Sequence, residues 1–307
     1  MHPTVPMIAD FLTYLFEHEK LKPKVIEGVK SCLSQAFNLC GVLDITHNIH
    51  LAALIRNFTI ECPAARFDVP KWNLNLVLQM LLSDPFEPIY EIDLKHLTYK
   101  TVFLLTLGSG ARSSEIHSLT HSGLSHSENW SEIWLRPSLD FLAKNQVSRD
   151  QKHRRKFCIP SLTHFTGHDL PDRKLCPVRA LRMYLHKTAT RRSVQKQKRL
   201  FISLNPSRHQ EISKSAISLW LRSTIKMAHS SCTDHQAQMV SANPHEIRKV
   251  ASSLAYDRSM SLHQILENCT WRSHSTFTSF YLKDLSEHFP DHMALKPCVA
   301  AGMLIKH

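Results

Sequence analysis

Two groups of apolar residues near the N-terminus recur at the three- and four-residue spacing of a helix face. They are Ile8, Phe11, Leu12 and Leu15 in the first group, and Val25, Val29, Cys32 and Phe37 in the second. Because such spacing normally marks the side that packs into a core, residues 1–66 are predicted to form a small all-α domain. Prolines at 63 and 70 bracket small and polar residues, which predicts a linker there.

A second domain is predicted over residues 71–290, and residues 291–307 form a tail. Its first helix has apolar residues at Leu74, Val77, Leu78 and Leu81. Asp93 is placed to cap a longer helix that runs through residues 102–107. Gly108-Ser109-Gly110 then turns the chain, and Ser113 or Ser114 can cap the next helix. Arg112 is therefore expected at a tight turn between two helices, where its side chain is held rigidly.

The periodicity changes from helical to alternating near residue 130. Residues 132–136 alternate, residues 139–143 are short and apolar, and residues 156–159 resemble a strand, which predicts a small antiparallel sheet. Pro177 can open a helix, and the arginine- and lysine-rich residues 191–199 are interpreted as a basic loop. Later helices are expected near residues 213–228, 244–256, 261–268 and 273–286. The predicted fold class is mainly α with a small antiparallel β-sheet, α+β.

The charge of the chain favours a polyanionic partner. Lys plus Arg number 38 against 26 Asp plus Glu, a formal net charge of +12 in 307 residues. A charge of this size favours nucleic acid, although a basic surface without a particular partner is the alternative. The basic residues predicted to contact DNA phosphates are Arg154, Arg155, Lys156, Arg191 and Arg192.

Several function classes are disfavoured by what the sequence lacks. The eight cysteines are scattered without a C-x-x-C pair, so they are interpreted as reduced, mostly buried thiols. His117, His121 and His126 lie close together, but no carboxylate or thiol completes a metal site. No G-x-x-x-x-G-K-[ST] motif occurs, which excludes a P-loop nucleotide enzyme. No signal sequence or apolar run of about 18 residues is visible, so an intracellular protein without cofactor, metal or membrane contact is expected.

Two arginines and a histidine stand where they suit phosphate chemistry. Arg112 follows the glycine turn, while His245 and Arg248 lie at i and i+3 in the first turn of a helix that Asn243-Pro244 begins. The amide N–H groups of a first turn favour an anion, and arginine forks neutralise the charge of a reacting phosphoryl group. Taken singly, each arginine is more often an ordinary surface residue, and a lone histidine is more often structural or solvated than catalytic.

Tyr281 is the candidate nucleophile, with His245 as the group that takes its proton. A phenol ionises near pH 10, so it needs a base or cationic surroundings to react. Trp271 can donate its indole N–H to a phosphate oxygen, and Lys144 can protonate the departing oxygen as a general acid. The alternatives are core packing for Tyr281 and Trp271 and a solvated lysine at 144.

Together these blocks resemble the catalytic pattern of the tyrosine recombinase (phage integrase) superfamily. Gly110-Ala111-Arg112-Ser113-Ser114-Glu115 looks like its first arginine box, with Glu115 in the usual acidic position. The blocks from His245 to Leu254 and from Trp271 to Leu282 look closest to recombinases of DIRS-like retrotransposons, including the Ngaro group. The resemblance covers residues 71–288, and Trp271 stands where many relatives carry histidine.

The resemblance implies an enzyme that cleaves and rejoins DNA without ATP or a metal. Residues 1–66 would be the core-binding (SAM-like) domain of a clamp around duplex DNA, and Tyr281 would form a 3′-phosphotyrosyl bond. Four protomers would act on two duplexes through a Holliday junction, and the tail would dock on a neighbouring protomer. Integration or excision of a mobile element in the nucleus is the implied role. A DNA-binding remnant without activity, or a topoisomerase, is the alternative.

Overall fold

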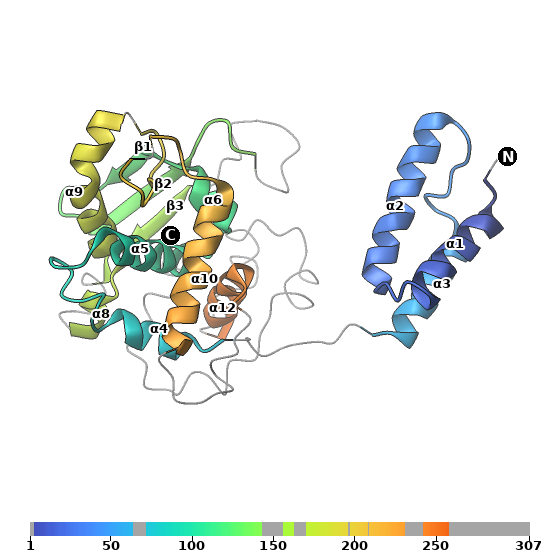
Figure 1. The fold of residues 1–307 in the computed structure, drawn as a ribbon, viewed down its shortest axis with the longest axis horizontal. Coiled ribbons are helices and arrows are strands. Elements are labelled where there is room, and N and C mark those ends of the chain that lie inside the picture. Colours follow the sequence, from blue (N-terminus) through green and yellow to red (C-terminus); the bar gives the residue numbers. More distant parts are fainter. Residues whose placement is uncertain are drawn as a thin grey trace. The chain divides into compact units, whose positions relative to one another are not determined.

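The computed structural model describes residues 3–63, 72–142, 156–162, 170–195, 197–207, 209–230 and 242–257. The chain divides into two compact units, Met1–Phe67 and Asp68–His307, and each is described by itself (Figure 1). Most of the predicted linker, the predicted helices at 261–268 and 273–286, and the tail lie outside the described residues.

The first unit is a bundle of α1 (Val5–Glu17), α2 (Pro23–Cys40) and α3 (Ile49–Glu61). The side chains at its centre are fully or almost fully buried: Ile8, Leu12, Ile26, Ile45, Leu51 and Phe58. The prediction is wrong for Phe11 and Val25, which are 44% and 50% exposed. A core of this size covers only a narrow stripe on each helix, so residues beside the stripe stay in contact with water.

The cysteines of this unit also differ from the prediction of mostly buried thiols. Cys32, Cys40 and Cys62 are exposed, whereas Cys158 and Cys176 of the second unit are half-buried and buried. All five are free thiols. The small core of the first unit again explains the difference, because its helices have more outward than inward positions.

Most of the second unit is helical, which confirms the predicted fold class. Its described helices are α4 (Leu74–Leu81), α5 (Leu94–Ser109), α6 (Ser113–Ser118), α8 (Leu170–Lys174), α9 (Pro177–Gln195), α10 (Lys214–Ser230) and α12 (Pro244–Asp257). Helix α5 runs through the middle and contacts α9, α10 and α12 (Figure 1). None of the described helices is long and apolar enough to span a membrane.

Helix α5 is buried at every position from Leu97 to Ser109. Asp93 caps it as predicted, since its carboxylate accepts from the amides of Lys95 and His96. The buried hydroxyls donate to the carbonyl four residues earlier, and so satisfy their hydrogen bonds within the helix; they belong to Thr98, Thr101, Thr106 and Ser109. This allows a helix with several polar residues to lie at the centre of the core.

A three-stranded antiparallel sheet packs beside these helices, in the order β1 (Leu119–His126), β2 (Glu132–Pro137) and β3 (Phe157–Pro160). The strands predicted at 132–136 and 156–159 are confirmed, but residues 139–142 lie outside the sheet. The third strand of the sheet is β1 instead, although apolar and polar residues alternate only weakly along it. The register shifts between Leu119 and Leu124, where a Cβ on Gly123 would lie 2.5 Å from the Arg136 carbonyl oxygen.

Candidate active site

The turn between α5 and α6 fixes the position of Arg112. Gly110 ends α5 in the left-handed conformation, with φ 57°. Arg112 is then the first residue beside α6, and its main-chain N–H donates to Glu115 Oε2 over 2.6 Å. The prediction that Ser113 or Ser114 caps α6 is therefore wrong. The Glu115 carboxylate reaches back to perform that role, and this places it beside the Arg112 side chain.

Arg248 reaches the same turn from α12. Its Nη1 donates to the Gly110 carbonyl oxygen over 2.9 Å, a contact between residues 138 positions apart in the sequence. The same atom lies 3.5 Å from Glu115 Oε2. Helix α12 packs against α5 and α10, so the long Arg248 side chain is buried with 1% of its surface exposed.

Glu115 lies between two guanidinium groups. Arg112 Nη1 is 3.7 Å from Glu115 Oε1, and the side chains of Arg112 and Glu115 are 10% and 2% exposed. In the part of the chain that the structure describes, these two cations and one carboxylate give the cluster an excess positive charge. Arg112 Nη1 is buried and has no hydrogen-bond partner among the described residues. Because an unsatisfied buried donor is costly, this arrangement suits a site that receives an anion from outside.

His245 lies three residues before Arg248, at the start of α12. Its side chain is exposed, and its main-chain N–H donates to Asn243 Oδ1 over 3.0 Å. The structure thus brings Arg112 and Arg248 together and places His245 on the helix that carries Arg248. The other predicted catalytic residues lie outside the described residues; they are Lys144, Trp271 and Tyr281.

The predicted DNA contacts divide into three cases. Arg154 and Arg155 lie outside the described residues, whereas Lys156 is exposed with its Nζ 5.0 Å from the centre of the Trp134 ring. The basic loop predicted at 191–199 is wrong, because α9 continues to Gln195.

Arg191 and Arg192 are tied to main-chain carbonyls instead of standing on a loop. Arg191 Nη2 donates to the carbonyls of Ser203 and Asn205, each over 3.0 Å. Arg192 is 8% exposed, and its Nη1 donates to the Arg199 carbonyl over 2.8 Å. These two arginines therefore brace the segment after α9 in the structure.

The sequence analysis missed a second ion cluster, which lies beside the first half of α5. Lys100 Nζ lies 2.5 Å from Glu87 Oε1, and Arg179 holds the same carboxylate with both Nη atoms, over 2.7 and 3.0 Å. Burial lowers the pKa of Lys100 to about 8. Burial would raise the pKa of Glu87, but the hydrogen bonds from Arg179 and Lys100 outweigh it and lower that pKa. The signal available in the sequence was a single lysine shortly before the apolar residues 102–105.

No protein-family model and no curated protein sequence matches this chain. Solved structures do match it. Two are complexes of the XerH site-specific recombinase, a pre-cleavage complex with difH substrate and a post-cleavage complex with palindromic difH substrate. Both are 14% identical to this chain, and each match covers 92% of it. The matches span 68% and 70% of the two XerH chains, with TM-scores of 0.56 and 0.57.

A lambda integrase dimer bound to a COC′ core site also matches. It is 15% identical to this chain, and the match has a TM-score of 0.51. The match covers 95% of this chain and 68% of the integrase chain. At these identities the likeness concerns the fold. The chain therefore has the mainly helical fold with a small antiparallel sheet that is found in tyrosine recombinases.

Proposed function

We propose that this protein is a DNA recombinase or integrase that breaks and rejoins DNA strands through Tyr281. The observation that carries the proposal is the meeting of Arg112 and Arg248 on Glu115, in a buried cluster with excess positive charge. The fold is shared with XerH and lambda integrase, whose structures were determined with difH substrate and with a COC′ core site. Duplex DNA is accordingly the proposed substrate here.

In the proposed reaction the two arginines hold the scissile phosphate. Their N–H groups donate to its nonbridging oxygens, where negative charge grows as phosphorus becomes five-coordinate. A guanidinium presents several donors in a fixed plane, so Arg112 and Arg248 can hold the phosphate from two directions. Glu115 acts as a positioning residue, since it contacts both arginines and caps the helix beside one of them.

Tyr281 supplies the nucleophile in this proposal. Its phenol oxygen forms a bond to phosphorus while the bond from phosphorus to the 5′ oxygen breaks. His245 accepts the phenol proton, Lys144 gives a proton to the departing oxygen, and Trp271 donates its indole N–H to the phosphate. The products are a 3′-phosphotyrosyl bond and a free 5′ hydroxyl. Attack by a 5′ hydroxyl of another strand reverses the step, so no ATP is consumed.

The setting proposed for this chemistry is a mobile element of the DIRS-like kind, in the nucleus. Four copies of the chain would act on two duplexes, and the tail of one copy would dock on the next. Removing residues 290–307 should then weaken DNA-dependent assembly, which analytical ultracentrifugation with duplex DNA measures. Unchanged assembly would contradict the role of the tail without affecting the proposed cleavage chemistry.

Trapping the covalent intermediate tests the proposed function. Nicked duplexes of random sequence, pooled with flanking repeats from the source genome, are mixed with the protein in EDTA, denatured and separated on a gel. We expect a protein–DNA adduct that peptide mapping assigns to Tyr281. The Tyr281→Phe variant, which keeps the ring and lacks the hydroxyl, should give none. Tight DNA binding without an adduct would instead support a DNA-binding remnant.

A further inference from the structure

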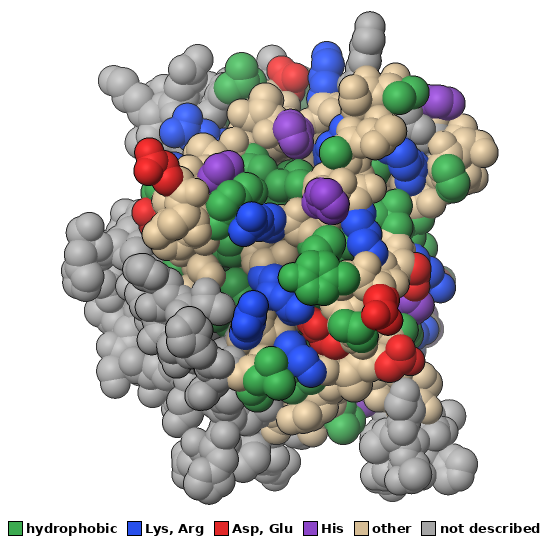
Figure 2. All heavy atoms as spheres, turned by 90° about the vertical axis from the view of Figure 1, so that its left-hand side faces the viewer, with side chains coloured by type: hydrophobic (Ala, Val, Ile, Leu, Met, Phe, Trp, Pro, Cys, Tyr) green, Lys and Arg blue, Asp and Glu red, His purple; other side chains and the backbone are tan. Residues whose placement is uncertain are grey.

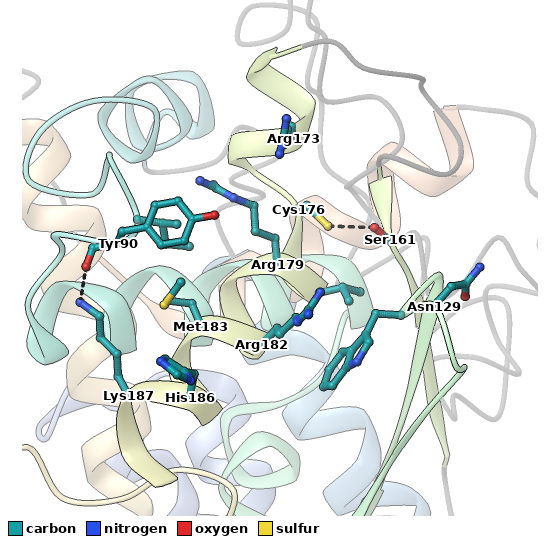
Figure 3. Close-up of a pocket in the computed structure, with 13 residues that line it drawn as sticks. Tyr90, Asn129, Ser161, Arg173, Cys176, Arg179, Arg182, Met183, His186 and Lys187 are labelled. Carbon is teal, nitrogen blue, oxygen red and sulfur yellow. Dashed lines mark hydrogen bonds between the residues drawn. The ribbon is translucent and has the colours of Figure 1, made fainter. Parts of the chain in front are cut away.

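A groove lies at the end of α5 remote from Arg112. It has a volume of about 720 Å³ and is lined by α9, the segment before α5 and the turn between β1 and β2 (Figure 3). Lys187 at its edge donates to the carbonyl of Ile92, two residues before α5 begins. Since α5 has 16 residues, the groove and the Arg112 turn are separated by a helix about 24 Å long.

The lining of this groove is strongly basic. Its cationic side chains come mainly from one side of α9, and the described lining residues include no Asp or Glu. Figure 2 shows Lys and Arg side chains gathered in the middle of this face, with histidines beside them. The basic lining residues are Arg173, Arg179, Arg182, His186 and Lys187.

Two of these cations are available to a ligand. Arg179 is held by Glu87 through two hydrogen bonds, and Lys187 donates to the carbonyls of Tyr90 and Ile92. Arg173 and Arg182 are exposed and form no ion pair with any described residue. Guanidinium groups prefer planar or tetrahedral oxyanions, and phosphate in particular.

An aromatic and apolar surface lies next to these arginines. Arg182 is 5.6 Å from the centre of the Trp130 ring, which also stacks on His126 at 3.8 Å. Trp130 has a positive φ of 57°, an uncommon conformation for a tryptophan, and it is half-buried in the groove wall. Tyr90, on the opposite wall, is 74% exposed. An aromatic surface beside a guanidinium that has no ion-pair partner among the described residues suits a flat base that carries a phosphate.

We propose that this groove binds a nucleoside phosphate unit of single-stranded nucleic acid, with the base against Trp130 or Tyr90 and the phosphate on Arg173 and Arg182. Its volume lies within the range of about 300–1,000 Å³ that small-ligand sites occupy. An acidic peptide would use the two arginines but leaves the adjoining aromatic surface without a partner. The proposal goes beyond strand cleavage and does not require Tyr281 to react.

Photo-crosslinking tests where the strand lies. A single-stranded oligonucleotide of about eight nucleotides, with 5-iodouracil in place of thymine, is irradiated with the full-length protein and the linked peptides are mapped. We expect adducts on Tyr90 or Trp130, or on residues adjoining them. Adducts confined to peptides that do not line the groove would overturn the proposal.

Affinity and its salt dependence test the two arginines. The Arg173→Ala/Arg182→Ala variant should bind the same oligonucleotide about tenfold more weakly, and the slope of log affinity against log salt should fall by about 0.7 for the one phosphate that the two arginines hold. The control variant Arg136→Ala/Lys198→Ala loses the same charge at exposed residues outside the groove. Equal losses in both variants, or none in the groove variant, would overturn the proposal, since net charge would then explain binding.

Competition identifies the ligand chemistry. Displacement of the crosslinking oligonucleotide by thymidine monophosphate would support binding of a nucleoside phosphate and show that a free nucleotide also enters the groove. Displacement by an unlabelled strand alone would support a strand as the source. Displacement by polyglutamate but by neither nucleotide form would overturn the proposal in favour of an acidic peptide. The Arg173→Ala/Arg182→Ala variant should still form the covalent adduct on Tyr281. Absence of the adduct would therefore contradict the proposed function alone, and unchanged oligonucleotide binding by the variant would contradict the groove proposal alone.

Discussion

Two carboxylates beside α5, Glu87 and Glu115, each lie between two cations, but the geometry differs. Beside the first half of the helix, Glu87 is held by Lys100 and Arg179 over 2.5 to 3.0 Å. At its end, Glu115 lies 3.5 and 3.7 Å from the nearest guanidinium nitrogens of Arg248 and Arg112. The first cluster thus has close, two-point hydrogen bonds, whereas the distances from the arginines to the carboxylate are longer in the second.

This difference is what we expect if the first cluster is structural and the second binds an anion, as proposed above. In the Glu87 cluster the carboxylate uses both oxygens, so the cations are committed to the protein. In the Glu115 cluster Arg112 Nη1 has no hydrogen-bond partner among the described residues, although it is buried. If the proposal holds, equal numbers of charges beside one helix serve stability in one cluster and anion binding in the other.

The largest effect on stability is expected for Glu87→Gln. This substitution leaves the buried Lys100 and the half-buried Arg179 without a counter-charge, which should lower the free energy of unfolding by about 3–5 kcal/mol. Urea unfolding followed by tryptophan fluorescence measures it, since all five tryptophans lie in the second unit. The exposed neighbour Glu91→Gln is the control and should change little. If Glu115→Gln destabilises as much as Glu87→Gln, the two clusters do not differ in the proposed way.

Arg248→Lys should affect the chemistry more than the stability. Lysine keeps the charge but loses the planar fork, so adduct formation at saturating DNA should slow by about 100- to 1,000-fold. A single-turnover assay on nicked DNA measures this rate. Arg222→Lys, at an exposed position on α10, should stay close to the unmodified protein. Equal rates for both variants would remove Arg248 from the proposed site.

Glu115→Gln should lower the rate about tenfold without weakening DNA binding. Glutamine can still accept the hydrogen bond from the Arg112 N–H, but the site gains positive charge and loses the group that orients both arginines. DNA affinity should therefore stay equal or increase while adduct formation slows. Measuring the dissociation constant and the single-turnover rate side by side distinguishes this role from a general loss of structure, which would impair both.

The smallest effect concerns the pH dependence of stability. The pKa of Lys100 is about 8 in the folded protein and near 10.5 in an unfolded chain. The unfolded chain thus binds the proton more tightly, so folding should become more favourable as pH rises from about 8 toward 10.5. Between pH 7 and pH 9 the gain should be about 1 kcal/mol relative to Lys100→Met. Parallel stability curves for the two proteins would show that Lys100 has an ordinary pKa.

Sequence patterns were sufficient where a local signal marks the structure. The apolar period and the Asp93 cap predicted α5, and Asn243-Pro244 predicted the start of α12, which carries Arg248. The glycine turn predicted the setting of Arg112. What brings Arg112 and Arg248 together is the packing of α12 on α5, a long-range contact that spacing alone does not encode.

The sequence prediction failed for elements whose local sequence signals are weak or misleading. Strand β1 has few apolar residues and depends on pairing with β2, so residues 139–143 were predicted to be a strand instead. Arg191 and Arg192 resemble a solvated basic run, yet they bond to carbonyls of residues 199–205. The Glu87 cluster joins residues up to 92 positions apart, and its members have no pattern in common.

The complete burial of α5 has a consequence for local opening of the protein. Its central amides lie in a helix covered on every side from Leu97 to Ser109, so their hydrogens should exchange with solvent only when the second unit unfolds as a whole. Lys100 lies on this helix, and the Gly110 carbonyl that anchors Arg248 adjoins its end. Protection measured at α5 would therefore report how often the anchor of Arg248 is lost in the resting protein.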